Sequence, residues 1–394
     1  MEIIPLQKET AIVAINYQSI AQKLKQAREL QSIMVETVSE DTGITVDRIH
    51  FIEVGQVRPS GDEVLILANY YRHDLRDFLD DKRPAPFEQT DLLYRRHGND
   101  FSPNDRRSIQ EFLYLCEIES ELESDLDIKK LRFPFSPQGK YYKGHGENAA
   151  RALRVFLGYA PNEIPRNLFA DFRKIGCHVF RRRLENSDIS GLYIEHPIAG
   201  HCLLVNYDED IYRQRFSVGH EAAHAIFDSS DSVVVSFRQR EGRYSEADLK
   251  EIRANRFASC YLMPPDQLPS VSTWTTDQAV HWAQQFRVST ESLSYALMEA
   301  KLIDKRTAQV IRSVKVHSSE KIDPEAPESL TDRQKERRLE LLKRGLSTYY
   351  VNLCFEAHQR DLISAGRLGE AFLADHAETR EISILFGRAI QYDA

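Results

Sequence analysis

The sequence predicts an α+β fold: a mostly helical, multi-domain chain in which one domain carries a small antiparallel sheet. Three observations lead to this prediction. Apolar residues recur at helical spacing over most of the 394 residues. Strand-like apolar runs are confined to residues 177–207, where residues 197–200 give a hairpin signal. Polar segments at residues 82–86 and 317–329 interrupt the helical pattern and indicate linkers.

The composition limits the class of protein. Hydrophobic residues make up 42% of the chain, so sizeable cores can form, and no apolar run is long enough to span a membrane. The first residues lack the basic and apolar regions of a secretion signal. The five scattered cysteines form no CxxC pair, so we expect a cytoplasmic protein with buried free thiols. A net charge of −8 argues against a protein that coats nucleic acid.

Residues 15–80 are expected to form a domain of five short helices. Glycines are placed to end the second and third helices, at Gly43 and Gly55. The spacing, and residues 52–60 in particular, resembles the XRE class of helix-turn-helix domains. The resemblance implies that the third helix would read DNA through Thr45, Asp47, Arg48 and His50.

Two features weaken the DNA-binding interpretation of this domain. Residues 1–80 hold eight Lys and Arg against thirteen Asp and Glu, a net charge of −5, whereas phosphate contacts usually need cations. The family usually begins its second helix with a Ser or Thr cap and a phosphate-contacting Gln, but Met34 and Val35 stand here and can do neither job. Two interpretations stay open. A dimer with a local basic face could still bind DNA, or the domain could instead recognise a protein, for example by mimicking a target repressor.

The flanking regions carry no catalytic signature. Residues 81–143 are expected to form a helical linker region, and residues 330–394 a helical accessory or sensor module. Acidic residues alternate between Glu117 and Asp127, which we interpret as a solvated face. Residues 181–183, three consecutive arginines, are interpreted as a solvated strand edge.

The chemistry of the chain lies in the segment His220-Glu221-Ala222-Ala223-His224, on a helix predicted over residues 213–228. Two histidines four residues apart point from the same helix face and can hold one zinc ion. The glutamate beside the first histidine can take a proton from a zinc-bound water. The sequence therefore predicts a zinc peptidase of the HExxH type rather than a solvated helix with two ordinary histidines.

A catalytic zinc ion needs three protein ligands and an open position for water. We expect the third ligand on a helix predicted over residues 246–263, where Glu251 is the candidate and Glu246 and Asp248 compete with it. Asn255 lies one turn after Glu251 and can accept the ring N–H of a ligating histidine. Manganese is the alternative to zinc at such a site.

Residues 215–224 and 251–258, with the Met-Pro pair at 263–264, resemble the ImmA/IrrE metallopeptidase family. Members of that family carry an RxRFxxxHExxH segment followed by ExxANxFA. The resemblance covers residues 144–305 and implies a zincin-like domain whose small sheet packs against the HExxH helix. It also implies a zinc endopeptidase that cleaves a helix-turn-helix repressor in a stress, DNA-damage or mobile-element response.

Two rival functions remain beside this one. The chain could be a DNA-binding regulator with a structural or sensory zinc domain, although Glu221 argues against it because structural zinc sites need no general base. Alternatively, it could cleave itself between residues 82 and 140.

Candidates for stabilising the oxyanion are Tyr193, Arg215 and Tyr261. Three histidines outside the HExxH segment are expected to be ordinary strand or turn residues. These are His178, His196 and His201.

Overall fold

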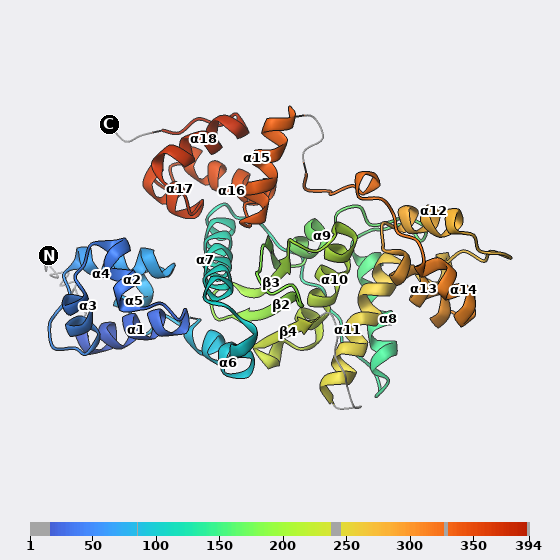
Figure 1. Ribbon diagram of the computed structural model, residues 1–394, viewed down its shortest axis with the longest axis horizontal. Coiled ribbons are helices and arrows are strands. Elements are labelled where there is room, and N and C mark those ends of the chain that lie inside the picture. The colour runs from blue at the N-terminus through green and yellow to red at the C-terminus, as the bar shows by residue number, and fades with distance from the viewer. Residues whose placement is uncertain (1–15, 85, 238–245, 327–329, 392–394) are drawn as a thin grey trace, which may run out of the picture. The chain divides into compact units, whose positions relative to one another are not determined.

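The computed structural model describes residues 16–84, 86–237, 246–326 and 330–391, in two compact units, Met1–Phe87 and Glu88–Ala394 (Figure 1). Each unit has its own hydrophobic core. The predicted α+β class is confirmed. The finer predicted division at residues 81–143, 144–305 and 330–394 stays a prediction. The first residues and parts of both predicted linkers, residue 85 and residues 327–329, lie outside the described residues.

The first unit consists of the five expected short helices. They are α1 (Tyr17–Leu30), α2 (Val35–Thr42), α3 (Val46–Glu53), α4 (Gly61–Tyr71) and α5 (Leu75–Leu79). Leu24, Ile49, Ile52 and Leu67 meet in their core. Gly43 ends α2 in the left-handed conformation, at φ 75°, which glycine adopts without strain.

A four-stranded sheet forms the centre of the second unit. Its strands are β1 (His178–Arg182), β2 (Ile189–His196), β3 (Gly200–Asn206) and β4 (Val233–Phe237), in the order β1-β3-β2-β4. The predicted hairpin joins β2 to β3, and β4 pairs antiparallel with β2. The sheet is mainly antiparallel, as expected, with one exception: β1 lies on the far side of β3 and pairs with it in parallel.

Helices surround this sheet, with α7 on one side and α10 on the other (Figure 1). The helices of the second unit are α6 (Phe87–His97), α7 (Pro103–Asp125), α8 (Tyr142–Phe156), α9 (Leu168–Lys174), α10 (Ile211–Phe227), α11 (Glu246–Leu262), α12 (Thr276–Phe286), α13 (Thr290–Glu299), α14 (Lys305–Arg312), α15 (Asp332–Lys343), α16 (Thr348–Gln359), α17 (Ala365–Ala371) and α18 (His376–Phe386). Within the described ranges, no helix is long and apolar enough to cross a membrane.

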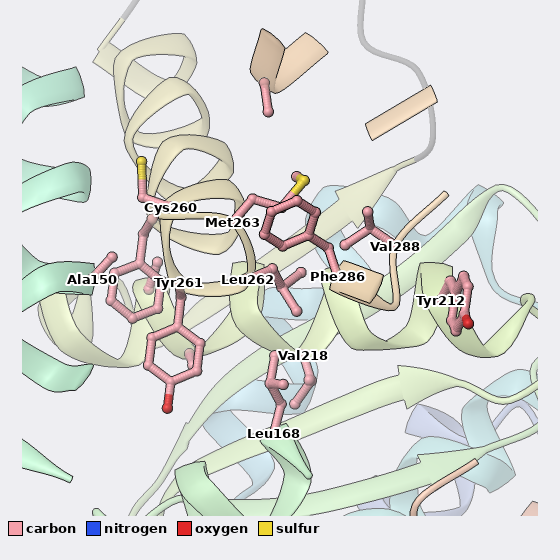
Figure 2. Packing of buried hydrophobic residues seen from close by; sticks show 14 of the residues in the cluster. Ala150, Leu168, Tyr212, Val218, Cys260, Tyr261, Leu262, Met263, Phe286 and Val288 are labelled. Carbon is pink, nitrogen blue, oxygen red and sulfur yellow. The ribbon is translucent and has the colours of Figure 1, made fainter. Parts of the chain in front are cut away.

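Apolar packing fixes α11 against α10 and α8. Val218 of α10 and Leu262 of α11 face one another, and Met263 lies beside Phe286 (Figure 2). Burial of each such side chain contributes roughly 1.5–3 kcal/mol. At Gly146 of α8, a β-carbon would lie 2.4 Å from the carbonyl oxygen of Arg253, so α8 and α11 approach at backbone distance. The position of α11 along α8 is therefore closely determined.

The acidic run from Glu117 to Asp127 is only partly solvated: Asp125 and Asp127 are exposed, as expected, but part of α7 lies between the sheet and the C-terminal helices. Glu117, Glu119 and Glu123 are buried. The Glu119 carboxylate lies 2.9 Å from His178 Nδ1, and Tyr349 of α16 donates to Glu123 Oε1 at 2.5 Å. These contacts tie α7 to β1 and to the C-terminal helices.

The expected solvated strand edge at residues 181–183 is also wrong for its first two arginines, which are buried. Arg181 lies 2.9 Å from Asp323 and 3.0 Å from Glu325, and Glu325 also lies 2.6 Å from Arg173. The segment predicted as a polar linker is therefore anchored to β1 and α9 by buried ion pairs.

Candidate metal centre and active site

The structure brings together three side chains that the sequence proposed as metal ligands. His220 and His224 lie one turn apart on α10, and their Nε2 atoms are 3.1 Å from each other. Glu251 of α11 reaches the same point, with Oε2 3.2 Å from His220 Nε2 and Oε1 3.8 Å from His224 Nε2. One ligand atom from each of the three lies within 4.8 Å of the others. Two imidazoles and a carboxylate of this kind form a typical ligand set for a catalytic zinc ion.

Neither competing carboxylate takes the place of Glu251. Glu246 faces Lys250 instead, at 3.6 Å. Asp248 lines the neighbouring cleft but does not belong to the group of ligand atoms. Asp248 lies about one turn before Glu251 on the same side of α11, so helical spacing alone does not decide between them, and the packing of α11 against α10 brings Glu251 to the two histidines.

Each histidine is oriented through its other ring nitrogen. His220 Nδ1–H donates to Asn255 Oδ1 at 3.0 Å, in the arrangement expected for Asn255. His224 Nδ1–H donates to Asp228 Oδ2 at 2.9 Å. Donation from Nδ1 places the lone pair on Nε2, which is the atom that faces the shared point. Both rings are therefore set to bind a cation.

Asp228 is a functional residue that the sequence analysis missed. Its carboxylate also accepts a hydrogen bond from Arg253 of α11. Burial raises the pKa of Asp228, but the hydrogen bonds from His224 and Arg253 outweigh burial and lower it overall. The signal that could have found it is its position four residues after His224, on the same helix face.

Glu221 is fully buried, and neither carboxylate oxygen accepts a well-formed hydrogen bond from the described residues, although the nearby Ser236 hydroxyl acts to lower its pKa. Burial raises the pKa of Glu221, against the opposing effect of His220 and His224. An unpaired buried carboxylate is costly, so we interpret it as a group kept for chemistry. The carboxylate lies against Gly191 of β2, which pairs in register with Ser236 of β4.

His220 and Glu251 interact strongly when no cation stands between them. Burial alone would lower the pKa of His220, but the Glu251 carboxylate outweighs burial and raises it. A proton on His220 Nε2 and a metal cation would therefore compete for the same position.

A cleft of about 1360 Å³ opens beside these residues. Its walls come from α10, α11, α13 and α14, and its lining includes Arg213, Phe216, Ser259, Tyr295 and Arg312. A cleft of this size can accept a peptide segment rather than only a small molecule.

The three proposed oxyanion-stabilising residues do not line this cleft. Arg215 donates to three backbone carbonyl groups, at 2.7, 2.7 and 3.2 Å. Tyr261 donates to Asp171 at 3.1 Å, and Tyr193 donates to Glu195 at 2.5 Å. All three side chains are occupied in holding the fold.

The remaining histidines and the cysteine of α11 lie outside the group of ligands. His178 contacts Glu119, His196 Nδ1 accepts from two backbone N–H groups, and His201 lies 2.7 Å from Glu195. Burial raises the pKa of the Cys260 thiol to about 12, so it is an inert core residue.

The DNA-reading candidates lie on or just before α3 of the first unit. The Thr45 side chain caps α3 by accepting from Arg48 N at 3.4 Å. The Arg48 guanidinium forms two hydrogen bonds with Glu63, at 2.7 and 2.8 Å. Asp47 and His50 are exposed.

Comparison with known proteins concerns the second unit. Residues 172–298 match the family model described as Peptidase_M78, IrrE N-terminal-like domain. The match contains the HExxH segment and Glu251, and it supports a metallopeptidase role and a bound metal. No curated protein matches the chain.

Proposed function

We propose that this protein is a zinc-dependent endopeptidase that cleaves a helix-turn-helix transcriptional repressor and so relieves repression in a stress, DNA-damage or mobile-element response. The observation that carries the peptidase part is the convergence of His220, His224 and Glu251 beside the buried carboxylate of Glu221. The match to a peptidase family model supports the same part. The repressor as substrate rests on the resemblance to the ImmA/IrrE family.

The donor set fits zinc. Catalytic zinc sites use three protein ligands from histidine and carboxylate groups, and manganese, the alternative, usually takes more oxygen ligands. When bound, zinc supplies Lewis-acid polarisation of the scissile carbonyl group and lowers the pKa of water to about 7.

The chain's own residues supply the proton transfers and the positioning. Glu221 removes a proton from the attacking water and later delivers one to the leaving amine. Its burial raises its pKa, which suits a group that must both accept and release a proton near neutral pH. Asn255 and Asp228 hold the two imidazoles in place, and the cleft holds the peptide beside them.

Co-expression with a repressor encoded by an adjacent gene tests the proposal. Glu221→Gln should retain metal and lose cleavage by a factor of about 10² or more, whereas His220→Ala should lose both. Cleavage that persists with Glu221→Gln would count against Glu221 as the base. Mass spectrometry of the purified chain, with zinc and with a chelator, separates self-cleavage from cleavage of a partner.

A further inference from the structure

Contacts within the chain compete with DNA phosphates for the cationic side chains from Tyr17 to Asp80, a stretch that the structure describes in full. All seven of its lysines and arginines have a partner within the chain. The pairs are Lys23 with Asp81, Lys25 with Glu29, Arg28 with Glu53, Arg48 with Glu63, Arg58 over the Tyr17 ring, and Arg76 with Asp74. Arg72 also has an interaction within the chain. Affinity for DNA comes mainly from cations that contact phosphates.

Arg48 is the one cation on the helix that would enter the major groove, and it is held firmly. Besides the two hydrogen bonds with Glu63, its Nη2 donates to the carbonyl oxygen of Arg58 at 3.0 Å. Arg48 also lowers the pKa of Glu63 to about 2, so this carboxylate is charged at any physiological pH. Contact between Arg48 and a base or phosphate would require loss of a bidentate ion pair.

The outer face of α3 is apolar and acidic instead. Val46, Phe51 and Val54 are 38%, 42% and 43% exposed. Asp47, one turn before Phe51, is exposed and has no partner among the described residues. Met34, which begins the neighbouring helix α2 without a capping hydrogen bond, is 67% exposed. Exposed apolar side chains next to an unpaired carboxylate are typical of a protein-binding surface, whereas the Asp47 carboxylate would repel phosphates.

We infer that the outer face of α3, formed by Val46, Asp47, Phe51 and Val54, binds a protein surface on which Lys or Arg side chains surround apolar ones. Charge complementarity selects this partner, since the face offers the exposed Asp47 carboxylate beside apolar side chains, in a stretch of the chain whose net charge is negative. The inference goes beyond the proposed peptidase activity and does not depend on it.

Selection from a displayed library of random peptides tests this inference with the full chain carrying Glu221→Gln, which prevents cleavage of bound peptides. We expect the enriched peptides to combine Lys or Arg with apolar residues. Asp47→Lys should weaken their binding about tenfold or more, because it replaces an attraction by a repulsion. Val46→Ser with Phe51→Ser removes exposed side chains only and should weaken binding similarly.

Asp277→Lys is the matched control. Asp277 is the second residue of α12 in the other unit, as Asp47 is of α3, and both helices have a threonine cap. Both aspartates are exposed, so the two substitutions change the charge equally and should destabilise their helices to the same extent. Circular dichroism confirms that each variant is folded. The inference is overturned if no peptide is enriched, if enriched peptides bind the α3 variants and Asp277→Lys equally well, or if a mixed-sequence DNA duplex binds the chain and Arg48→Ala abolishes that binding.

Discussion

Gly191 of β2 lies directly against the carboxylate of Glu221 on α10: a β-carbon at position 191 would stand 2.7 Å from Glu221 Oε1. It would also stand 2.9 Å from the carbonyl oxygen of Leu204 on β3. Sheet and helix therefore meet at the proposed general base without an intervening side chain. This close approach fixes where Glu221 can lie.

Gly191→Ala should reduce the cleavage rate about 10²-fold, because a displacement of the catalytic carboxylate by about 1 Å has effects of that size. Metal content, measured by elemental analysis, should stay unchanged. Glu221→Asp shortens the side chain and should recover part of the loss when combined with Gly191→Ala. Strictly additive effects of the two changes would contradict a direct contact.

Asp228→Asn should weaken metal binding about 10- to 100-fold, the usual effect of removing a carboxylate that orients a ligating histidine. The change also leaves the buried Arg253 guanidinium without its charged partner. Competition with a chromogenic chelator measures the dissociation constant. Asp231→Asn is the control, since Asp231 pairs with Lys250 near the end of the same helix but contacts neither histidine. Equal losses in the two variants would remove the special role of Asp228.

The metal-free protein should lose stability as the pH rises above about 6.5, the ordinary pKa of histidine. The pKa of His220 is raised in the folded chain, so the folded state binds this proton more tightly than the unfolded state does. The resulting stabilisation is complete below the unfolded pKa and disappears as the pH rises through the folded one. Zinc competes with the same proton, so the increase in melting temperature on adding zinc should grow over that interval. A zinc effect that is independent of pH would argue against this competition.

Glu325→Gln should destabilise the second unit by about 3–5 kcal/mol, because it leaves the buried Arg173 and Arg181 without a shared charged partner. Urea denaturation measures the loss. Glu320→Gln, which changes an exposed carboxylate in the same segment, should cost less than about 0.5 kcal/mol. A small effect of Glu325→Gln would show that the segment before α15 is a simple tether.

Local sequence patterns were enough to predict many of the helices and the chemical groups of the site, although they did not predict strand β4. Periodicity indicated the five helices of the first unit and the helices that carry His220 and Glu251, because an amphipathic helix declares its period locally. The spacing of His220 and His224 alone requires that they share a helix face. The same four-residue spacing after Glu251 indicated Asn255.

Which groups meet across elements depends on packing between segments that are distant in the sequence. The choice of Glu251 over Glu246, the contact of Gly191 with Glu221 and the hydrogen bond of Arg253 to Asp228 depend on how α10, α11 and β2 pack. The same holds for Glu117, Glu119 and Glu123 of α7, which carry charged groups yet are buried. A charged side chain is buried where a residue of opposite charge from a distant segment packs against it, and the local sequence does not identify that residue.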